Sequence, residues 1–387
     1  MAVPEATIPV TMGFVPESLA VPDDEHPGLR RAGPRASAPY ARDGLERHEC
    51  AAVDATQAEL ARPDLLQLGF DVVDLSGLAA VQEACRRVLD DGAVSDDDAA
   101  AIRSALTGSV LHSEGGHTLT VVYLADEGFI MRKAGPNAMA VVGPRSSGMN
   151  DHGGATSVHA DQDVFGTPLT QLMDSRAPEL FRHDSPDGRN DDAALMLVNL
   201  WIPLQQITQP LVLADGRSLD RRRHQLRYGL ATQSFLERDD DMAVNDIWTF
   251  LHDPGQQWHL RSDMDHRRAY VFDTLSTAHS AGTLPGEAVA EHWYRTLEAA
   301  EAAVERGDAT RLVEGLSSPE PPGLPPETPP ALRRAVDAMA AVADEASGDP
   351  ALTCGDGAAD WLDRSRRARR RVVRMSLEMR VVVSIDA

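Results

Sequence analysis

The residues best suited to chemistry in this chain are a histidine and an aspartate two positions apart, His159 and Asp161. They lie at the end of a short extended segment, and side chains at positions i and i+2 of a strand point to the same face. An imidazole and a carboxylate on one face, joined by a second histidine, would form a facial triad that leaves three positions open on non-haem Fe(II). The pair has little weight alone, because a chain with 13 histidines and many aspartates produces this spacing by chance.

The second histidine is expected at the end of a later strand. His279 follows the strand-like run 269–272 and has small neighbours such as Ala278 and Ser280, which allow a metal and its ligands to approach closely. A rival pair, His112 and Glu114, precedes two glycines that predict a turn. Four other histidines occupy polar or helix-like surroundings and are more simply explained as packed or solvated side chains: His252, His259, His266 and His292.

The C-terminal segment alternates polar and apolar residues as a strand does. Arg374, Ser376, Glu378 and Arg380 share one face, and the other face is apolar. An arginine with a hydroxyl two residues later can hold a carboxylate through a bidentate pair and a third hydrogen bond. An edge strand with a solvated, self-paired charged face would produce the same pattern, and spacing alone does not separate the two interpretations.

These motifs in this order resemble a known family. The pair His159-x-Asp161, the run Asn199-Leu200-Trp201-Ile202-Pro203, a strand followed by a histidine, and the ending R-x-S-x-E-x-R are similar to the Fe(II)/2-oxoglutarate-dependent oxygenases. The similarity is nearest to the group that includes the cephamycin-pathway hydroxylase component and the gibberellin-desaturase-like enzymes. It covers roughly residues 118–280 and 372–385.

The resemblance implies a full set of site residues and co-substrates. His159, Asp161 and His279 would bind Fe(II), Arg374 and Ser376 would bind the distal carboxylate of 2-oxoglutarate, and Asn199 would face that co-substrate. With O2, such enzymes convert 2-oxoglutarate to succinate and oxidise an unactivated C–H bond. A carboxylate ligand argues against halogenation, because related halogenases need that position for chloride. The chain departs from the family pattern in the long insertion between His279 and Arg374.

The spacing of short strands predicts the fold class. About eight strand-like runs separated by Gly, Pro, Asp or Asn, one of them at 139–142, predict a mainly β fold with α additions, a double-stranded β-helix (jelly-roll) core. Early helices are expected at 81–89 and 99–106, the second capped by Ser95. We expect four parts: an extended N-terminal arm (1–65), the jelly-roll core with N-terminal helices (66–285), a helical insertion with a proline-rich linker (286–371), and a C-terminal strand returning to the core (372–387).

Composition limits the possible partners. The net charge of −23 argues against a nucleic acid or an anionic membrane surface as partner, since both attract basic proteins. The three cysteines, Cys50, Cys85 and Cys354, form neither a disulfide framework nor a thiolate metal site. With no signal peptide and no apolar run of membrane-spanning length, a cytoplasmic location is expected. The helical insertion could form a lid, a homodimer face or a lobe beside the core.

The predicted function is oxidation of a small molecule, by hydroxylation, desaturation or cyclisation, in natural-product biosynthesis. Two alternatives stay open. One is a cupin-like metalloenzyme that uses iron without 2-oxoglutarate. The other is a non-catalytic jelly-roll binding protein in which the His-x-Asp pair is incidental.

Overall fold

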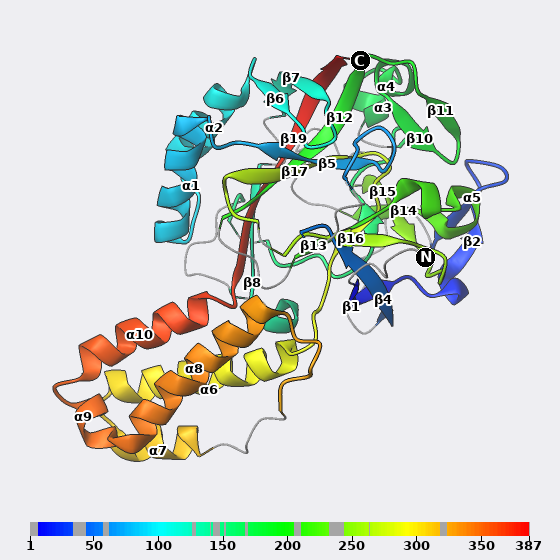
Figure 1. The fold of residues 1–387 in the computed structure, drawn as a ribbon. Helices are drawn as coiled ribbons and strands as arrows, with labels where there is room; N and C mark the ends of the chain where they lie inside the picture. Colours follow the sequence, from blue (N-terminus) through cyan, green and yellow to red (C-terminus); the bar gives the residue numbers. More distant parts are fainter. Residues whose placement is uncertain are drawn as a thin grey trace, which may run out of the picture.

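Two β-sheets face one another across the centre of the molecule, and a separate group of helices projects from one end of them (Figure 1). The computed structural model describes residues 7–33, 44–56, 62–125, 129–139, 141, 148–150, 152–166, 169–204, 210–231, 244–262, 264–317 and 323–386. The chain passes repeatedly from one sheet to the other, so that strands distant in sequence lie side by side. This arrangement is the predicted jelly-roll core.

The larger sheet has ten strands and carries the histidines of interest. From edge to edge it consists of β1 (Thr7–Phe14), β4 (Glu46–Asp54), β16 (Trp258–Leu260), β13 (Leu211–Ala214), β18 (His279–Ala281), β9 (His159–Ala160), β15 (Val244–Phe250), β14 (Gln225–Ala231), β3 (Arg30–Ala32) and β2 (Ala20–Pro22). The residues before position 65 thus supply four strands, β1 to β4, whose irregular sequence gave no expectation of strands.

The smaller sheet has seven strands and carries the C-terminal motif. Its order is β5 (Phe70–Asp74), β17 (Arg268–Asp273), β12 (Leu195–Pro203), β19 (Arg374–Asp386), β7 (Thr118–Leu124) and β6 (Val110–His112), with β8 (Ile130–Ala134) also paired to β19. The last strand, β19, lies between β12 and β7 in this sheet. A hairpin of β10 (His183–Ser185) and β11 (Gly188–Asn190) stands apart from both sheets.

Most predicted elements are present, and the strand expected at 139–142 lies partly outside the described residues. A strand was expected at 139–142, yet Met139 and Val141 lie outside any strand, and positions 140 and 142 are not among the described residues. The expected extended segment 157–160 is a strand only over its last two residues.

Two helices pack beside the smaller sheet, as expected. They are α1 (Ala79–Asp91) and α2 (Asp96–Leu106). Ser95 caps α2 through a capping box, since its hydroxyl accepts from the backbone N–H of Asp98 and the Asp98 side chain accepts from the Ser95 backbone. Short helices α3 (Leu169–Leu172), α4 (Ala177–Leu180) and α5 (Arg221–His224) lie in connections.

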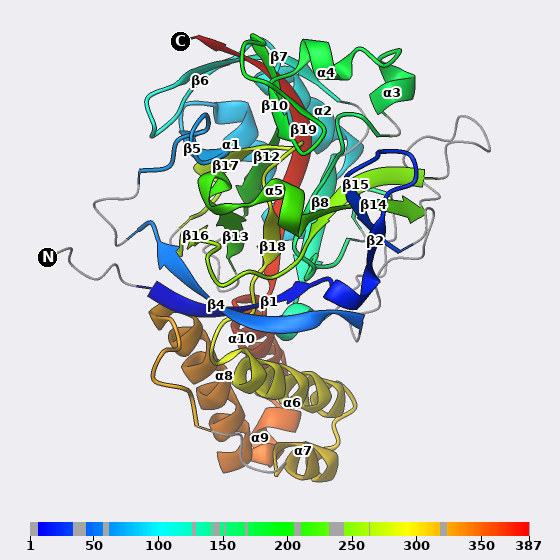
Figure 2. The same ribbon diagram turned by 90° about the vertical axis from the view of Figure 1, so that its right-hand side faces the viewer.

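The remaining helices form a lobe between β18 and β19 in the chain, which we call the helical lobe. It contains α6 (Glu287–Glu305), α7 (Ala309–Leu316), α8 (Pro330–Gly348), α9 (Pro350–Cys354) and α10 (Ala358–Arg370). Figures 1 and 2 show it extending from one end of the sheets. Within the described residues, no helix combines the length and apolar character needed to cross a membrane.

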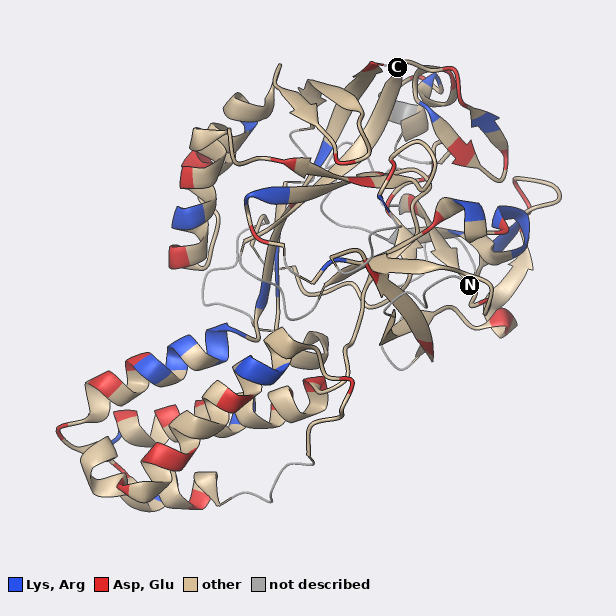
Figure 3. Cartoon of the chain, in the orientation of Figure 1, with Lys and Arg blue, Asp and Glu red and all other residues tan. Residues whose placement is uncertain are grey.

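The arginines of α10 are paired rather than simply solvated. Figure 3 shows basic residues along α10 beside acidic positions on its neighbours. Arg364 contacts Glu345 of α8, and Arg369 donates to Glu301 of α6, a carboxylate that also accepts from Ser365. These ion pairs hold the helices of the lobe to one another.

Candidate metal centre

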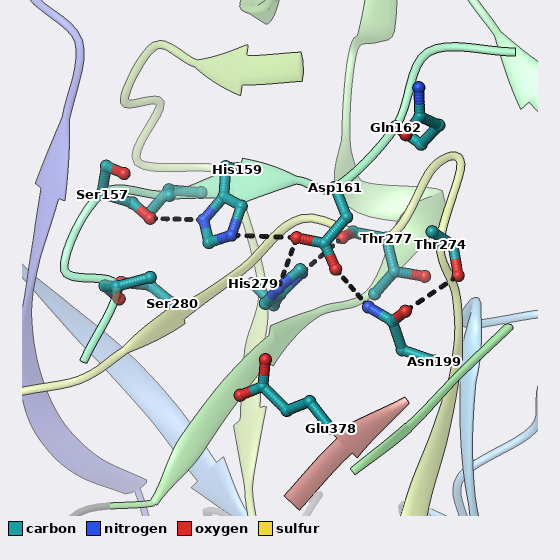
Figure 4. Close-up of polar contacts among 12 residues, drawn as sticks. Ser157, His159, Asp161, Gln162, Asn199, Thr274, Thr277, His279, Ser280 and Glu378 are labelled. Carbon is teal, nitrogen blue, oxygen red and sulfur yellow. Dashed lines mark hydrogen bonds and ion pairs between the residues drawn. The ribbon is translucent and has the colours of Figure 1, made fainter. Parts of the chain in front are cut away.

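The two histidines of the predicted triad lie on neighbouring strands. His159 begins β9 and His279 begins β18, and the two residues are directly opposed in the antiparallel pairing. Side chains of opposed residues point to the same face of a sheet, and the two imidazole rings are 4.4 Å apart between centroids. Asp161 follows β9, and one ligand atom from each of the three residues lies within 4.8 Å of the others (Figure 4). The structure therefore brings together the three residues selected from the sequence.

Backbone carbonyls fix the orientation of both imidazoles. Nδ1 of His159 donates to the carbonyl oxygen of Ser157 at 2.8 Å, and Nδ1 of His279 donates to that of Thr277 at 3.0 Å (Figure 4). A carbonyl only accepts, so the proton of each neutral imidazole is on Nδ1 and the Nε2 lone pair is free. This is the arrangement in which histidine binds a metal through Nε2.

The free Nε2 atoms face the carboxylate. Oδ1 of Asp161 lies 3.3 Å from Nε2 of His159 and 3.9 Å from Nε2 of His279. Burial, with the charge of His159, lowers the pKa of His279 to about 4, so its imidazole is neutral at pH 7. A cation placed among Nε2 of the two histidines and Oδ1 of Asp161 would be attracted by all three atoms at such distances.

The other carboxylate oxygen of Asp161 is held by Asn199. The Nδ2 of Asn199, on β12, donates to Oδ2 of Asp161, and Oδ1 of Asn199 accepts from Thr274 Oγ1 at 3.1 Å (Figure 4). Burial acts to raise the pKa of Asp161, but His159, His279 and Arg380 hold it well below its usual range. The carboxylate is therefore ionised and fixed in orientation. The structure places the Asn199 amide on Asp161, a role that was not predicted.

Arg374 and Ser376 lie buried on the inner face of β19 with unused hydrogen-bond donors. Their exposed fractions are 2% and 0%, and Nε and Nη1 of Arg374 and Oγ of Ser376 have no hydrogen-bond partner among the residues that the structure describes. Burial lowers the pKa of Arg374 to about 10, against the opposing charge of Glu378. A buried cation with open donors is costly unless an anion occupies them. The interpretation of this strand as a solvated, self-paired edge is wrong for these two residues.

The next residue on this face, Glu378, forms an ion pair that was not predicted. Nε of Arg132, on β8, donates to both carboxylate oxygens of Glu378 at 2.7 Å, and its Nη1 donates to the Gly153 carbonyl at 3.0 Å. Arg132 lies on a strand and is mostly buried. The signal was present in the sequence, because Arg132 and Glu378 occupy inward positions of two strand-like runs.

The rival histidines lie elsewhere. Within the described parts of the chain, the only cluster suited to a metal is the triad of His159, Asp161 and His279. Glu114 pairs with Arg261, His252 stacks on His48, His266 contacts the Leu204 carbonyl, and His292 packs edge-on against Trp293. His259 lines a cavity of about 820 Å³ beside Trp258, and none of the triad residues lines that cavity.

Asp163 belongs to a different charged cluster. Its carboxylate accepts from Arg227, a buried residue of β14. Arg227 also donates to Asp23 and Asp187 and lies over the ring of Trp248. This cluster ties β14 to the N-terminal segment. Trp201 and Trp248 are both buried core aromatics, as expected.

Comparisons with known proteins gave structural neighbours only. No family model matches the chain, and no curated protein matches it. One solved structure, "iron and alpha-ketoglutarate-dependent endoperoxidase NvfI with different conformation", is 14% identical, with 99% of both chains covered and a TM-score of 0.48. A second structure of that endoperoxidase is 15% identical, with 98% of each chain covered and a TM-score of 0.44. Similarity at this level does not assign an activity to this chain.

Proposed function

We propose that this chain is a non-haem Fe(II)/2-oxoglutarate-dependent oxygenase that oxidises a small molecule. One observation carries the proposal. A buried His-Asp-His cluster with its lone pairs converging lies in the same jelly-roll core as a buried arginine and serine whose donors lack partners. The first group suits a cation and the second suits a carboxylate.

The triad fits the chemistry of a divalent metal. Two imidazole Nε2 atoms and one ionised carboxylate oxygen form the two-histidine, one-carboxylate set typical of non-haem Fe(II). Both Nδ1–H groups and the second carboxylate oxygen are already bonded to the protein. Such outer partners fix metal ligands in place and raise their affinity.

The pair Arg374 and Ser376 fits a carboxylate. Guanidinium donors and a hydroxyl two residues apart on one strand face can make a bidentate pair and a third hydrogen bond. Glu378 does not compete for them, because both of its oxygens are engaged by Arg132. The distal carboxylate of 2-oxoglutarate would satisfy the open donors of Arg374 and Ser376.

The residues of the chain bind and orient, and the bound metal supplies the redox chemistry. When bound, Fe(II) activates O2 so that 2-oxoglutarate is oxidised to succinate and CO2 and a substrate C–H bond is oxidised, each organic molecule giving two electrons. His159, His279 and Asp161 hold the metal, Asn199 holds Asp161, and Arg374 with Ser376 holds the far end of the co-substrate. These residues are shared by hydroxylation, desaturation and cyclisation, and a role in natural-product biosynthesis is part of the proposal.

Two measurements test the proposal. Wild type and His159→Ala are loaded with Fe(II) without oxygen, desalted and analysed for iron per chain, with His292→Ala as the matched control on α6. We expect iron in the wild type and control and its loss in His159→Ala. Unchanged iron content in His159→Ala would contradict the proposal and favour the non-catalytic binding protein, in which the His-x-Asp pair is incidental.

Succinate formation separates the proposal from a cupin-like enzyme that uses iron without 2-oxoglutarate. We expect iron-dependent conversion of 2-oxoglutarate to succinate, with a sharply raised 2-oxoglutarate requirement in Arg374→Ala. Iron binding without any succinate would favour the cupin-like alternative.

The remaining expectations accompany this function as proposals. A cytoplasmic location agrees with three free cysteines, two of them buried. A homodimer face on the helical lobe and kinship with the cephamycin hydroxylase-component and gibberellin-desaturase-like group stay predictions.

A further inference from the structure

The helical lobe is connected directly to both halves of the candidate site. Strand β18, which begins with His279, ends at Ala281, and α6 begins at Glu287. At the other end, α10 ends at Arg370 and β19 begins with Arg374. Figures 1 and 2 show the lobe meeting the sheets at this end. The position of α6 is therefore tied to the strands that carry a triad histidine and the open arginine.

The first residue of α6 makes a buried contact with the core. Glu287 is 1% exposed, and its two carboxylate oxygens accept from the backbone N–H groups of Leu284, at 2.8 Å, and Asn137, at 2.7 Å. One turn later, Glu291 accepts from Nδ2 of Asn137 at 2.8 Å. Two carboxylates of the lobe thus hold one residue of the core, by its backbone and by its side chain.

Asn137 lies in a strained turn. The turn Pro136–Ala138 has φ angles of 54° at Asn137 and 55° at Ala138, in the left-handed region. Asparagine tolerates this region, but a residue such as alanine adopts it at a cost of about 1 kcal/mol or more. Such conformations persist only where surrounding contacts impose them. The hydrogen bonds from Asn137 to Glu287 and Glu291 are contacts of this kind.

The turn continues the strand that lies beside Arg374. It directly follows β8, whose last residue, Ala134, is the pairing partner of Arg374. A Cβ built on Gly154 would lie 3.4 Å from Cβ of Ala134, 3.6 Å from that of Ala138 and 3.6 Å from that of Ala281. The turn, the partner strand of Arg374 and the end of β18 therefore pack closely around one glycine.

Glu287 also contributes negative charge to the surroundings of Arg374 without occupying the hydrogen-bond donors of that arginine. Burial raises the pKa of Glu287 to about 7, and the charge of Arg374 opposes that rise. Both oxygens of Glu287 are bonded to backbone N–H groups, whereas two donor atoms of Arg374 have no partner. A carboxylate that bonded Arg374 directly would compete with a carboxylate ligand, and the two backbone bonds hold Glu287 away from that role.

We propose that Glu287 is a positioning residue for the co-substrate site, through which the helical lobe fixes the turn at Asn137 and keeps Arg374 ready for a carboxylate. Glu291 assists by holding the side chain of Asn137. The lobe is then a structural part of the 2-oxoglutarate site. This inference rests on the proposed function, since it assigns 2-oxoglutarate to Arg374.

The test measures 2-oxoglutarate affinity directly. Protein loaded with Fe(II) is titrated with 2-oxoglutarate at pH 8 in the absence of O2, by calorimetry and by the visible absorbance of the chelate. We expect Glu287→Ala to weaken 2-oxoglutarate binding about tenfold, the size typical of residues that orient a ligand-binding group. Fe(II) affinity, measured in the same samples, should stay at the wild-type value.

A matched control separates positioning from general stability of the lobe. Glu301→Gln alters another buried carboxylate of α6, whose partners Ser365, Arg366 and Arg369 all lie on α10 of the same lobe. It should lower the melting temperature and leave 2-oxoglutarate affinity unchanged. Asn137→Gly should leave the melting temperature unchanged, because glycine accepts the positive φ. It should weaken 2-oxoglutarate binding, because the hydrogen bond from the Asn137 side chain to Glu291 is lost.

The outcomes are distinct. Wild-type affinity in Glu287→Ala, or equal weakening in Glu301→Gln, would overturn the positioning role while leaving the oxygenase proposal in place. Absence of 2-oxoglutarate binding in the wild-type protein itself would overturn both.

Discussion

Nε2 of His159 lies 3.3 Å from Oδ1 of Asp161, although the Nδ1 proton of the same imidazole is committed to the Ser157 carbonyl. Nε2 of His279 faces the same oxygen, with its own Nδ1 proton committed to Thr277. Three possible acceptor atoms, Nε2 of each histidine and Oδ1 of Asp161, therefore converge in the interior of the protein. Groups of this type are arranged to share a cation.

Asn199→Ala should weaken metal binding without removing a ligand. The amide holds one oxygen of Asp161, so its loss lets the carboxylate rotate, and Fe(II) affinity should fall about 10- to 100-fold. Competition with a chelator measures the change. The control is Asn190→Ala. Asn190 lies on β11 and its side chain donates to the Pro178 carbonyl, so this variant should bind Fe(II) as the wild type does. Equal affinity in the two variants would show that Asp161 needs no support from Asn199.

Arg374→Met should stabilise the ligand-free protein while abolishing 2-oxoglutarate binding. It replaces a buried cation with unbonded donors by an apolar chain of similar length, so the free energy of unfolding should rise by about 2 kcal/mol. Urea denaturation measures the stability and calorimetry the binding. A destabilised variant that still binds 2-oxoglutarate would contradict the role given to Arg374.

The ion pair between Arg132 and Glu378 should show strong coupling. Breaking it from either side leaves a mostly buried charge alone, so Arg132→Met and Glu378→Gln should each destabilise the protein by about 3 kcal/mol. The combined variant should lose clearly less than the sum of the two, as a double-mutant cycle of urea denaturation would reveal. If the two changes in the free energy of unfolding simply add, Arg132 and Glu378 have no interaction energy with each other.

Asp273 should make stability depend on pH. Burial raises its pKa to about 6, despite hydrogen bonds from Ser276 and the Leu275 backbone, whereas in the unfolded chain it titrates near its ordinary value of about 3.9. Its contribution to stability is therefore complete below the unfolded pKa and is lost as pH rises through the folded one.

The variant Asp273→Asn removes this titration. Its free energy of unfolding relative to the wild type should be higher at pH 8 than at pH 5 by about 1 kcal/mol. Urea denaturation of both proteins at the two pH values measures the difference. A difference that is constant with pH would mean that Asp273 titrates normally in the folded protein.

The sequence predicted the parts of the site that rest on strand periodicity. His159 with Asp161, and Arg374 with Ser376, were selected because alternate residues of a strand share a face. The structure brings His159 and Asp161 together at the end of β9 (Figure 4) and buries Arg374 and Ser376 on β19. His279 was selected by its position after β17 and its small neighbours. Its direct opposition to His159 depends on pairing between β18 and β9, two short strands far apart in sequence.

The parts that were missed depend on contacts between distant segments. The amide of Asn199 reaches Asp161 because β12 passes beneath the end of β9, and nothing local to Asn199 encodes that distance. Strand β1 contains Pro9, and β4 begins with charged residues, so neither shows clean alternation, although the two pair along their whole length. The turn at Asn137, just before the expected strand at 139–142, is bonded to Glu287 of α6, a residue 150 positions later that no local pattern links to it.

The most direct test of the account is the chelate itself. Fe(II) and 2-oxoglutarate are added without oxygen to the wild-type protein, to His279→Ala and to Arg374→Ala, and the visible spectrum is recorded. The account predicts a weak charge-transfer band in the wild type, its loss in His279→Ala, and its appearance in Arg374→Ala only at much higher 2-oxoglutarate. A wild-type protein that binds Fe(II) but shows no band at any 2-oxoglutarate concentration would contradict it.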